Sequence, residues 1–123
     1  MTNSEHIAAF TAFLRKADEW SRIAEADEKE AFAQRLDIEH RLELHDDDYR
    51  TTARLGKLLR QVNRRRRAAK NTAEALAPVL QWAAENRKAL NALDQALGAT
   101  RKIEEQQKSR VYTPRTDILQ VIE

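Results

Sequence analysis

The chain has 123 residues, of which 34% are charged, 6% are aromatic and none is Cys. This length suits a single domain, since single domains usually run to about 100–150 residues. The lack of Cys excludes disulfides, thiolate metal sites and a Cys nucleophile. We find no secretory leader and no run near the roughly 18 apolar residues of a membrane-spanning helix, so we expect a soluble, cytoplasmic protein with no membrane partner.

Charge is sorted into two adjacent segments. Asp18 to Asp48 contains twelve acids and four bases, whereas Tyr49 to Ala73 contains nine Lys or Arg residues and no acid. The formal net charge of +2 therefore averages over a strongly acidic and a strongly basic segment. Because the composition favours helices over strands, we expect an all-α helical bundle of about four helices, built on a long antiparallel helical hairpin and forming one domain over 1–123.

The first 25 residues have the pattern of an amphipathic helix. Thr2 and Glu5 have the spacing of a capping box, which predicts a helix over Asn3 to Ala24. At about 100° per residue, one face of this helix carries the apolar side chains that we expect in the core: Phe10, Phe13, Leu14, Ala17, Trp20 and Ala24. A second cap at Asp27 predicts that another helix starts there, within a segment 27–108 that holds the hairpin and the helix after it.

His45 to Asp48 predicts the turn of the hairpin, with an acid capping the helix that follows. In an antiparallel hairpin about this turn, residues whose numbers sum to about 93 lie side by side. Glu43 should then meet Arg50, and Glu39 should meet Arg54, because an Arg fork binds a carboxylate well. Glu28 should lie beside Arg65 and Arg66. The residues expected to form structural salt bridges are therefore Glu28, Glu39, Glu43, Arg50, Arg54, Arg65 and Arg66.

A row of bases is predicted on the helix face opposite the apolar stripe. These residues are the candidate site for a nucleic acid or an acidic partner: Lys57, Arg60, Arg64, Arg67 and Lys70. Cations in a row on a straight helix can follow phosphates. The alternative is a solvated face, or salt bridges to the first helix or to a sister subunit. No aromatic residue lies among these bases, which argues against a stacking surface for single strands.

The C-terminal half carries a second apolar pattern. Pro78 should bend the helix, and Val79 and Trp82 continue its outer face, which implies a contact with the first helix or with a dimer mate. Asn86 predicts a break before a last helix over Arg87 to Lys108. The extension 109–123 should dock on the bundle or on another molecule, and the predicted protein-interface residues are Val79, Trp82, Ile118, Leu119 and Ile122. We expect a homo-oligomer, with a dimer favoured.

The sequence contains little catalytic chemistry. His40 with Asp37 or Glu43 gives one copy of a spacing that carboxylate-bridged di-metal bundles need on two helices. There is no Gly-rich phosphate loop and no H-E-x-x-H motif. We therefore expect no catalytic residues, no metal site and no cofactor.

Several short motifs resemble a known group of proteins. They are Asp37-Ile38-Glu39-His40, Glu43-Leu44, Leu59-Arg60 with Arg64 to Lys70, and Tyr112-Thr113-Pro114-Arg115. Over Asp27 to Arg115 the chain resembles small helical proteins encoded in phages and prophages. The resemblance implies a phage or prophage origin, action in the host cytoplasm and an accessory role. We expect a non-enzymatic accessory or adaptor protein that acts through protein–protein contacts, for example as an inhibitor or modulator of a host or phage protein. The alternative is a nucleic-acid-binding protein that uses the exposed basic helix face.

Overall fold

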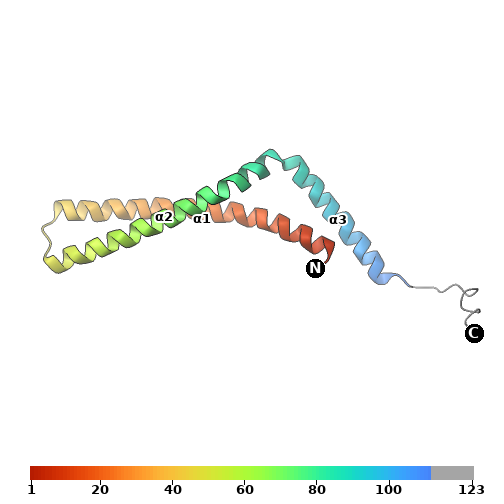
Figure 1. The fold of residues 1–123 in the computed structure, drawn as a ribbon, viewed down its shortest axis with the longest axis horizontal. Coiled ribbons are helices and arrows are strands. Elements are labelled where there is room, and N and C mark those ends of the chain that lie inside the picture. Colours follow the sequence, from red (N-terminus) through yellow and green to blue (C-terminus); the bar gives the residue numbers. More distant parts are fainter. Residues whose placement is uncertain (112–123) are drawn as a thin grey trace, which may run out of the picture.

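The computed structural model describes residues 1–111. These residues form three helices and no strand: α1 (Asn3–Leu44), α2 (Tyr49–Glu85) and α3 (Arg87–Ser109). The two long helices form an antiparallel hairpin, and α3 bends away from the line of α2 and passes the start of α1 (Figure 1). The prediction of an all-α fold is confirmed. Residues 1–111 contain three helices, however, where about four were expected.

Helix α1 runs without interruption for 42 residues, so the expected break between Ala24 and Asp27 is wrong. Neither Gly nor Pro occurs near this position. The side chain of Asp27 does not cap a new helix but accepts a hydrogen bond from Arg65 Nη2 of α2, at 3.2 Å. The capping box at Thr2 is confirmed, because its side chain accepts from the Glu5 amide and the Glu5 side chain accepts from the Thr2 amide.

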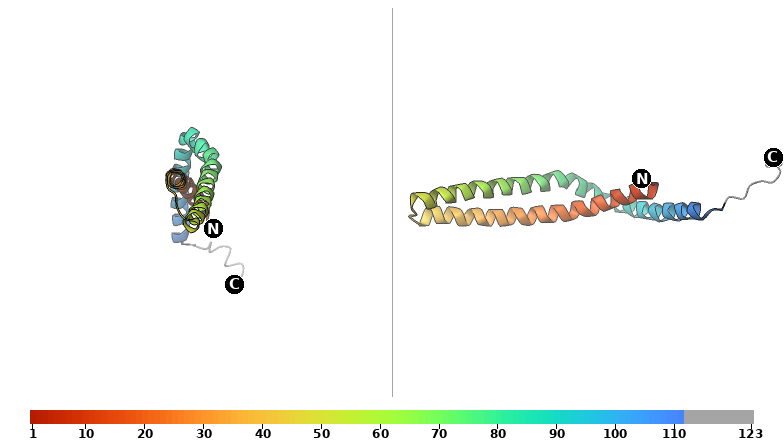
Figure 2. Two further views of the ribbon diagram at one scale, coloured as in Figure 1. Left: turned by 90° about the vertical axis from the view of Figure 1, so that its left-hand side faces the viewer. Right: turned by 90° about the horizontal axis from the view of Figure 1, so that it is seen from below.

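The two helices of the hairpin lie side by side (Figure 2), and a narrow seam of small and branched side chains holds them together. Along α1 the buried residues recur every seven positions: Ala17, Ala24, Ala31 and Ile38. Val62 and Ala69 are buried on α2, and Leu55 and Leu59 pack against the Ile38 end of the seam. A seven-residue repeat keeps one side of a helix facing its partner, which is coiled-coil packing. The seam explains why α1 stays continuous where its charge pattern suggested two helices.

The connections between the helices lie where the local sequence signals predicted them. α1 ends at Leu44 and α2 begins at Tyr49, as the turn prediction required. α2 continues through Pro78 and ends at Glu85. The side-chain amide of Asn86 then donates to the Trp82 carbonyl oxygen at 2.8 Å, which satisfies an acceptor at the end of α2. α3 follows at once and ends at Ser109, one residue later than predicted.

Candidate interaction surfaces

The Arg run at positions 64–67 divides between the two sides of α2. Arg65 reaches α1, where it pairs with Asp27 at 3.2 Å and donates to the Gln34 side chain. Arg66 is half-buried, and its guanidinium carbon lies 5.8 Å from the centre of the Phe32 ring. Arg64 and Arg67 are exposed. Within one turn of helix, two bases hold the hairpin together and two face solvent.

The ion pairs of residues 1–111 differ from the expected ones. Arg65 pairs with Asp27 and not with Glu28. Glu39 pairs at 3.1 Å with Arg35, one turn earlier on its own helix, and not with Arg54. Side chains four residues apart on a helix are close neighbours, so a local partner competes well with one across the hairpin. Within this range, the other expected members take part in no ion pair: Glu28, Glu43, Arg50, Arg54 and Arg66.

The cationic ridge comprises Lys57, Arg60, Arg64 and Arg67, with Lys70 at its end. All five side chains are exposed, and none forms an ion pair within the described part of the chain. A shallow recess of about 380 Å³ runs along the ridge, and every residue that lines it belongs to α2: Gly56, Leu59, Arg60, Asn63, Arg64 and Arg67. The ridge therefore lies on a face of α2 that α1 does not cover.

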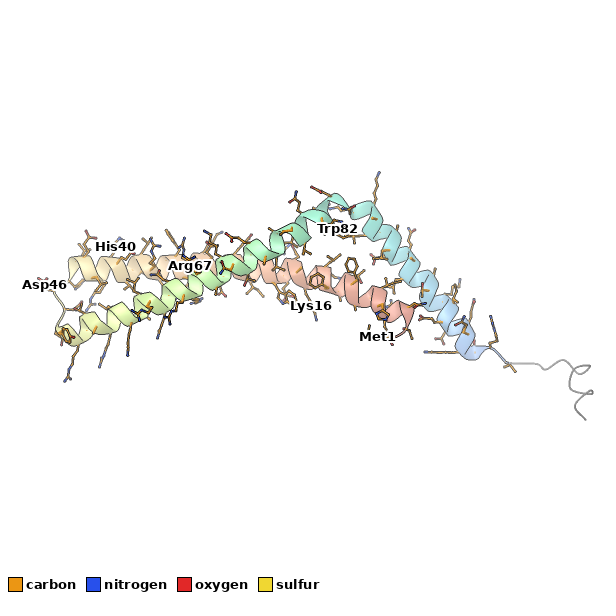
Figure 3. All side chains as sticks on the ribbon, in the orientation of Figure 1. Met1, Lys16, His40, Asp46, Arg67 and Trp82 are labelled. Carbon is orange, nitrogen blue, oxygen red and sulfur yellow. The ribbon has the colours of Figure 1, made fainter. Side chains whose placement is uncertain are left out.

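The aromatic surface lies near the start of α1 and the end of α2. It is a recess of about 430 Å³ lined by Phe10, Phe13, Leu14, Pro78, Val79 and Trp82. The rings of Phe10 and Trp82 meet edge to face, with their centres 6.1 Å apart, and Figure 3 shows where Trp82 stands on α2. The second contact expected for Trp82 is thus made with the first helix.

The aromatic rings of this surface remain partly open to solvent. Phe10 and Phe13 are each 41% exposed and Trp82 is 45% exposed. The expectation that the aromatic residues of α1 enter the core is therefore wrong for these two Phe residues, and it is also wrong for Trp20, which is 45% exposed. The reason is tertiary, because α2 diverges from α1 beyond their crossing (Figure 1) and leaves the rings half covered.

The start of α1 is fastened to α3 by a carboxylate. Glu104 accepts hydrogen bonds from the Ser4 amide at 3.1 Å and from the Ser4 hydroxyl at 2.5 Å. The Ser4 hydroxyl and then the Ser4 amide, which both stabilise the charged form, lower the pKa of Glu104. These two residues lie 100 positions apart, and no signal in the sequence pairs them.

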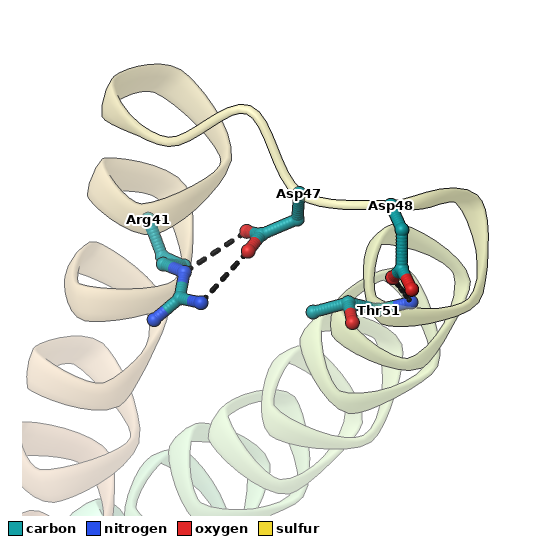
Figure 4. A network of polar contacts seen from close by, with 4 residues as sticks. All are labelled: Arg41, Asp47, Asp48 and Thr51. Atoms are coloured by element: carbon teal, nitrogen blue, oxygen red, sulfur yellow. Dashed lines mark hydrogen bonds and ion pairs between the residues drawn. The ribbon is translucent and has the colours of Figure 1, made fainter.

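The hairpin turn contains a second pair that the sequence did not reveal (Figure 4). Arg41 Nε and Nη2 donate to the two carboxylate oxygens of Asp47 at 2.9 and 2.7 Å. This bidentate contact lowers the pKa of Asp47 and raises that of Arg41. Asp48 accepts from the Thr51 amide at 2.8 Å as the cap of α2, and the hydrogen bonds from Thr51 lower the pKa of Asp48.

Ile118, Leu119 and Ile122 lie outside the described residues. Over residues 1–111, no helix is both long and apolar enough to cross a membrane, and no three His, Asp or Glu side chains gather as metal ligands would. Comparisons with protein-family models, curated proteins and solved structures find no match to this chain.

Proposed function

We propose that this chain is a non-enzymatic accessory protein, of the phage-encoded adaptor kind, that acts through protein–protein contact at the aromatic surface. The observation that carries the proposal is the half-exposed aromatic group of Phe10, Phe13 and Trp82. Aromatic side chains are enriched at the centres of protein interfaces, where they bury large areas at a low cost in conformational entropy. The short motifs that resemble phage and prophage proteins support the accessory role.

The occupant of the aromatic surface in this proposal is a second copy of the chain. The chain exposes 10311 Å², whereas a compact monomer of 14.2 kDa exposes about 6,800 Å². The twelve residues outside the described range account for at most about 2,000 Å² of the difference, even as extended chain. The remainder, at least about 1,500 Å² on each chain, exceeds the roughly 800 Å² that each partner buries in a standard specific interface.

Charge also favours self-association at this surface. No residue that lines the recess is charged, so two copies can face each other there without like-charge repulsion. The nearest base of the cationic ridge, Lys70, precedes Pro78 by eight residues, which is about 12 Å along a helix. A two-fold contact between identical apolar surfaces is the commonest way in which soluble proteins dimerise.

The test is the molar mass in solution across a range of protein concentrations. We expect light scattering to give a dimer at about 10–100 µM and Phe13→Lys to give a monomer, because it places a charge inside the interface. Ile103→Lys is the matched control, since Ile103 is an exposed apolar residue of α3 outside the recess. Its variant should remain dimeric, and circular dichroism should show native helix content in both. A wild-type monomer at 100 µM, or a dimeric Phe13→Lys, would contradict the proposal.

A further inference from the structure

We infer that the cationic ridge of α2 binds the sugar–phosphate backbone of a double-stranded nucleic acid. This activity goes beyond protein contact at the aromatic surface, which uses a different stretch of the same helix. Three features carry the inference: the spacing of the bases, the absence of neutralising acids, and the open recess between them.

The spacing of the bases matches a phosphate backbone. Lys57 and Arg67 lie ten residues apart, which is about 15 Å along an α-helix. At about 100° per residue, Lys57, Arg60, Arg64 and Arg67 fall within about 80° of one another around the helix axis. Each strand of a duplex places one phosphate per about 3.4 Å of the duplex axis, so a straight row of about 15 Å lies within reach of several phosphates. α2 is unbroken across this region, which holds the bases in one line.

No acid among residues 1–111 forms an ion pair with the ridge. The segment from Tyr49 to Ala73 contains no Asp or Glu. Asp27 of α1 reaches the basic segment, and it pairs with Arg65, which lies outside the ridge. Within residues 1–111, Lys57, Arg60, Arg64 and Arg67 make no ion pair, so their positive charge is available to a ligand.

Small residues leave the space between the bases open. Gly56 and Asn63 line the recess with Arg60, Arg64 and Arg67. A Cβ at position 56 would meet no atom of the chain within 4 Å, so the backbone there can be approached closely. The Asn63 amide adds an uncharged hydrogen-bond donor, which is a common partner of phosphate and sugar oxygens.

The chemistry of the ridge favours a duplex over other polyanions. No aromatic residue lies between Tyr49 and Trp82, so the bases of a single strand have no stacking platform. An anionic membrane would require an apolar face beside the cations, and the apolar face of α2 is packed against α1. Three of the four central bases are Arg, whose fork binds phosphate through two hydrogen bonds.

The experiment is fluorescence anisotropy with the full chain and a labelled 24-base-pair DNA duplex at several salt concentrations. Four phosphate contacts predict a log–log salt slope of about −3 to −4, which is roughly a 100-fold loss of affinity between 50 and 200 mM salt. The test variant is Lys57→Gln, Arg60→Gln, Arg64→Gln and Arg67→Gln combined. The matched control on α3 is Lys88→Gln, Arg101→Gln, Lys102→Gln and Lys108→Gln, which changes the net charge equally at exposed positions.

We expect the ridge variant to bind at least 50-fold more weakly with a slope near zero, and the α3 control to bind within about threefold of wild type. Binding to an RNA duplex of the same sequence would also support the inference and would show which duplex is preferred. No binding at 50 mM salt, equal losses in both variants, tighter binding to single strands, or competition by polyglutamate as strong as by the duplex would overturn it. The molar mass of the ridge variant separates this test from that of self-association, since the ridge lies outside the aromatic surface.

Discussion

Ser4 and Glu104 are joined by two hydrogen bonds although 100 residues separate them in the chain. Ser4 is buried, and one carboxylate satisfies both its amide and its hydroxyl. Because the first amides of a helix have no partner within the helix, Glu104 serves α1 as a cap supplied by α3. This contact closes the corner in which the ends of α1 and α3 meet (Figure 1).

Removing the Glu104 carboxylate should loosen the contact between the start of α1 and α3. In Glu104→Ala the Ser4 amide loses its partner and the Ser4 hydroxyl keeps only its contact with the Thr2 hydroxyl. We expect amide hydrogen exchange over residues 3–8 and 97–108 to accelerate by about tenfold or more. Exchange in the seam around Ala31 and Val62 should change little. Glu105→Ala is the adjacent control, because Glu105 is exposed and its side chain makes none of the hydrogen bonds that hold Ser4. Equal acceleration in both variants would show that the contact does not hold the helices together.

Acid should destabilise the protein through three carboxylates. The pKa values of Asp47, Asp48 and Glu104 are lowered in the folded protein by hydrogen bonds, from Arg41, Thr51 and Ser4 respectively. A lowered folded pKa means that the unfolded chain binds protons first, so the stability is present above about pH 4–4.5 and is lost as pH falls below it. We expect the melting temperature to stay constant from pH 7 to pH 5 and to decrease between pH 4 and pH 2. The fall should be smaller in Asp47→Asn, and a higher melting temperature at pH 3 than at pH 7 would contradict this.

The seam should contribute more to stability than the charged residues beside it. Ile38 is 6% exposed and packs in a cluster with Val62, so Ile38→Ala should cost about 2–4 kcal/mol in the free energy of unfolding. Its neighbour Glu39 has an exposed side chain and pairs only along its own helix. Glu39→Ala should therefore change the unfolding free energy by no more than about 0.5 kcal/mol. Urea denaturation of both variants tests this order, whereas the salt bridge expected between Glu39 and Arg54 would have made Glu39→Ala cost more than a surface substitution.

Replacing Gly56 with Ala should stabilise the folded protein. It lies inside α2, where Gly is less favourable than Ala, and a Cβ there would meet nothing within 4 Å. We expect Gly56→Ala to raise the free energy of unfolding by about 0.5–1 kcal/mol in urea denaturation. Gly98→Ala on α3 is the matched control, since its Cβ would also meet no atom. A loss of stability at position 56 alone would reveal a packing contact on the ridge.

The sequence signals that succeeded are local ones. The capping box at Thr2, the turn before Tyr49 and the break at Asn86 each depend on a few neighbouring residues. The seven-residue repeat of Ala17, Ala24, Ala31 and Ile38 was also present in the sequence. A matching seven-residue repeat on α2 consists of Leu55, Val62 and Ala69. The two repeats together would have predicted an unbroken α1.

The sequence by itself determined that the chain is helical, that its hairpin turns at residues 45–48, and that a row of bases stands opposite the apolar stripe of α2. These properties follow from periodicity, because the position of a residue on its helix sets the direction of its side chain. Only the tertiary structure decided that Asp27 pairs with Arg65, that Ser4 meets Glu104, and that Phe10 and Trp82 stay half exposed. Periodicity gives a direction about one helix axis, whereas the neighbour found in that direction depends on where the helix axes cross and diverge.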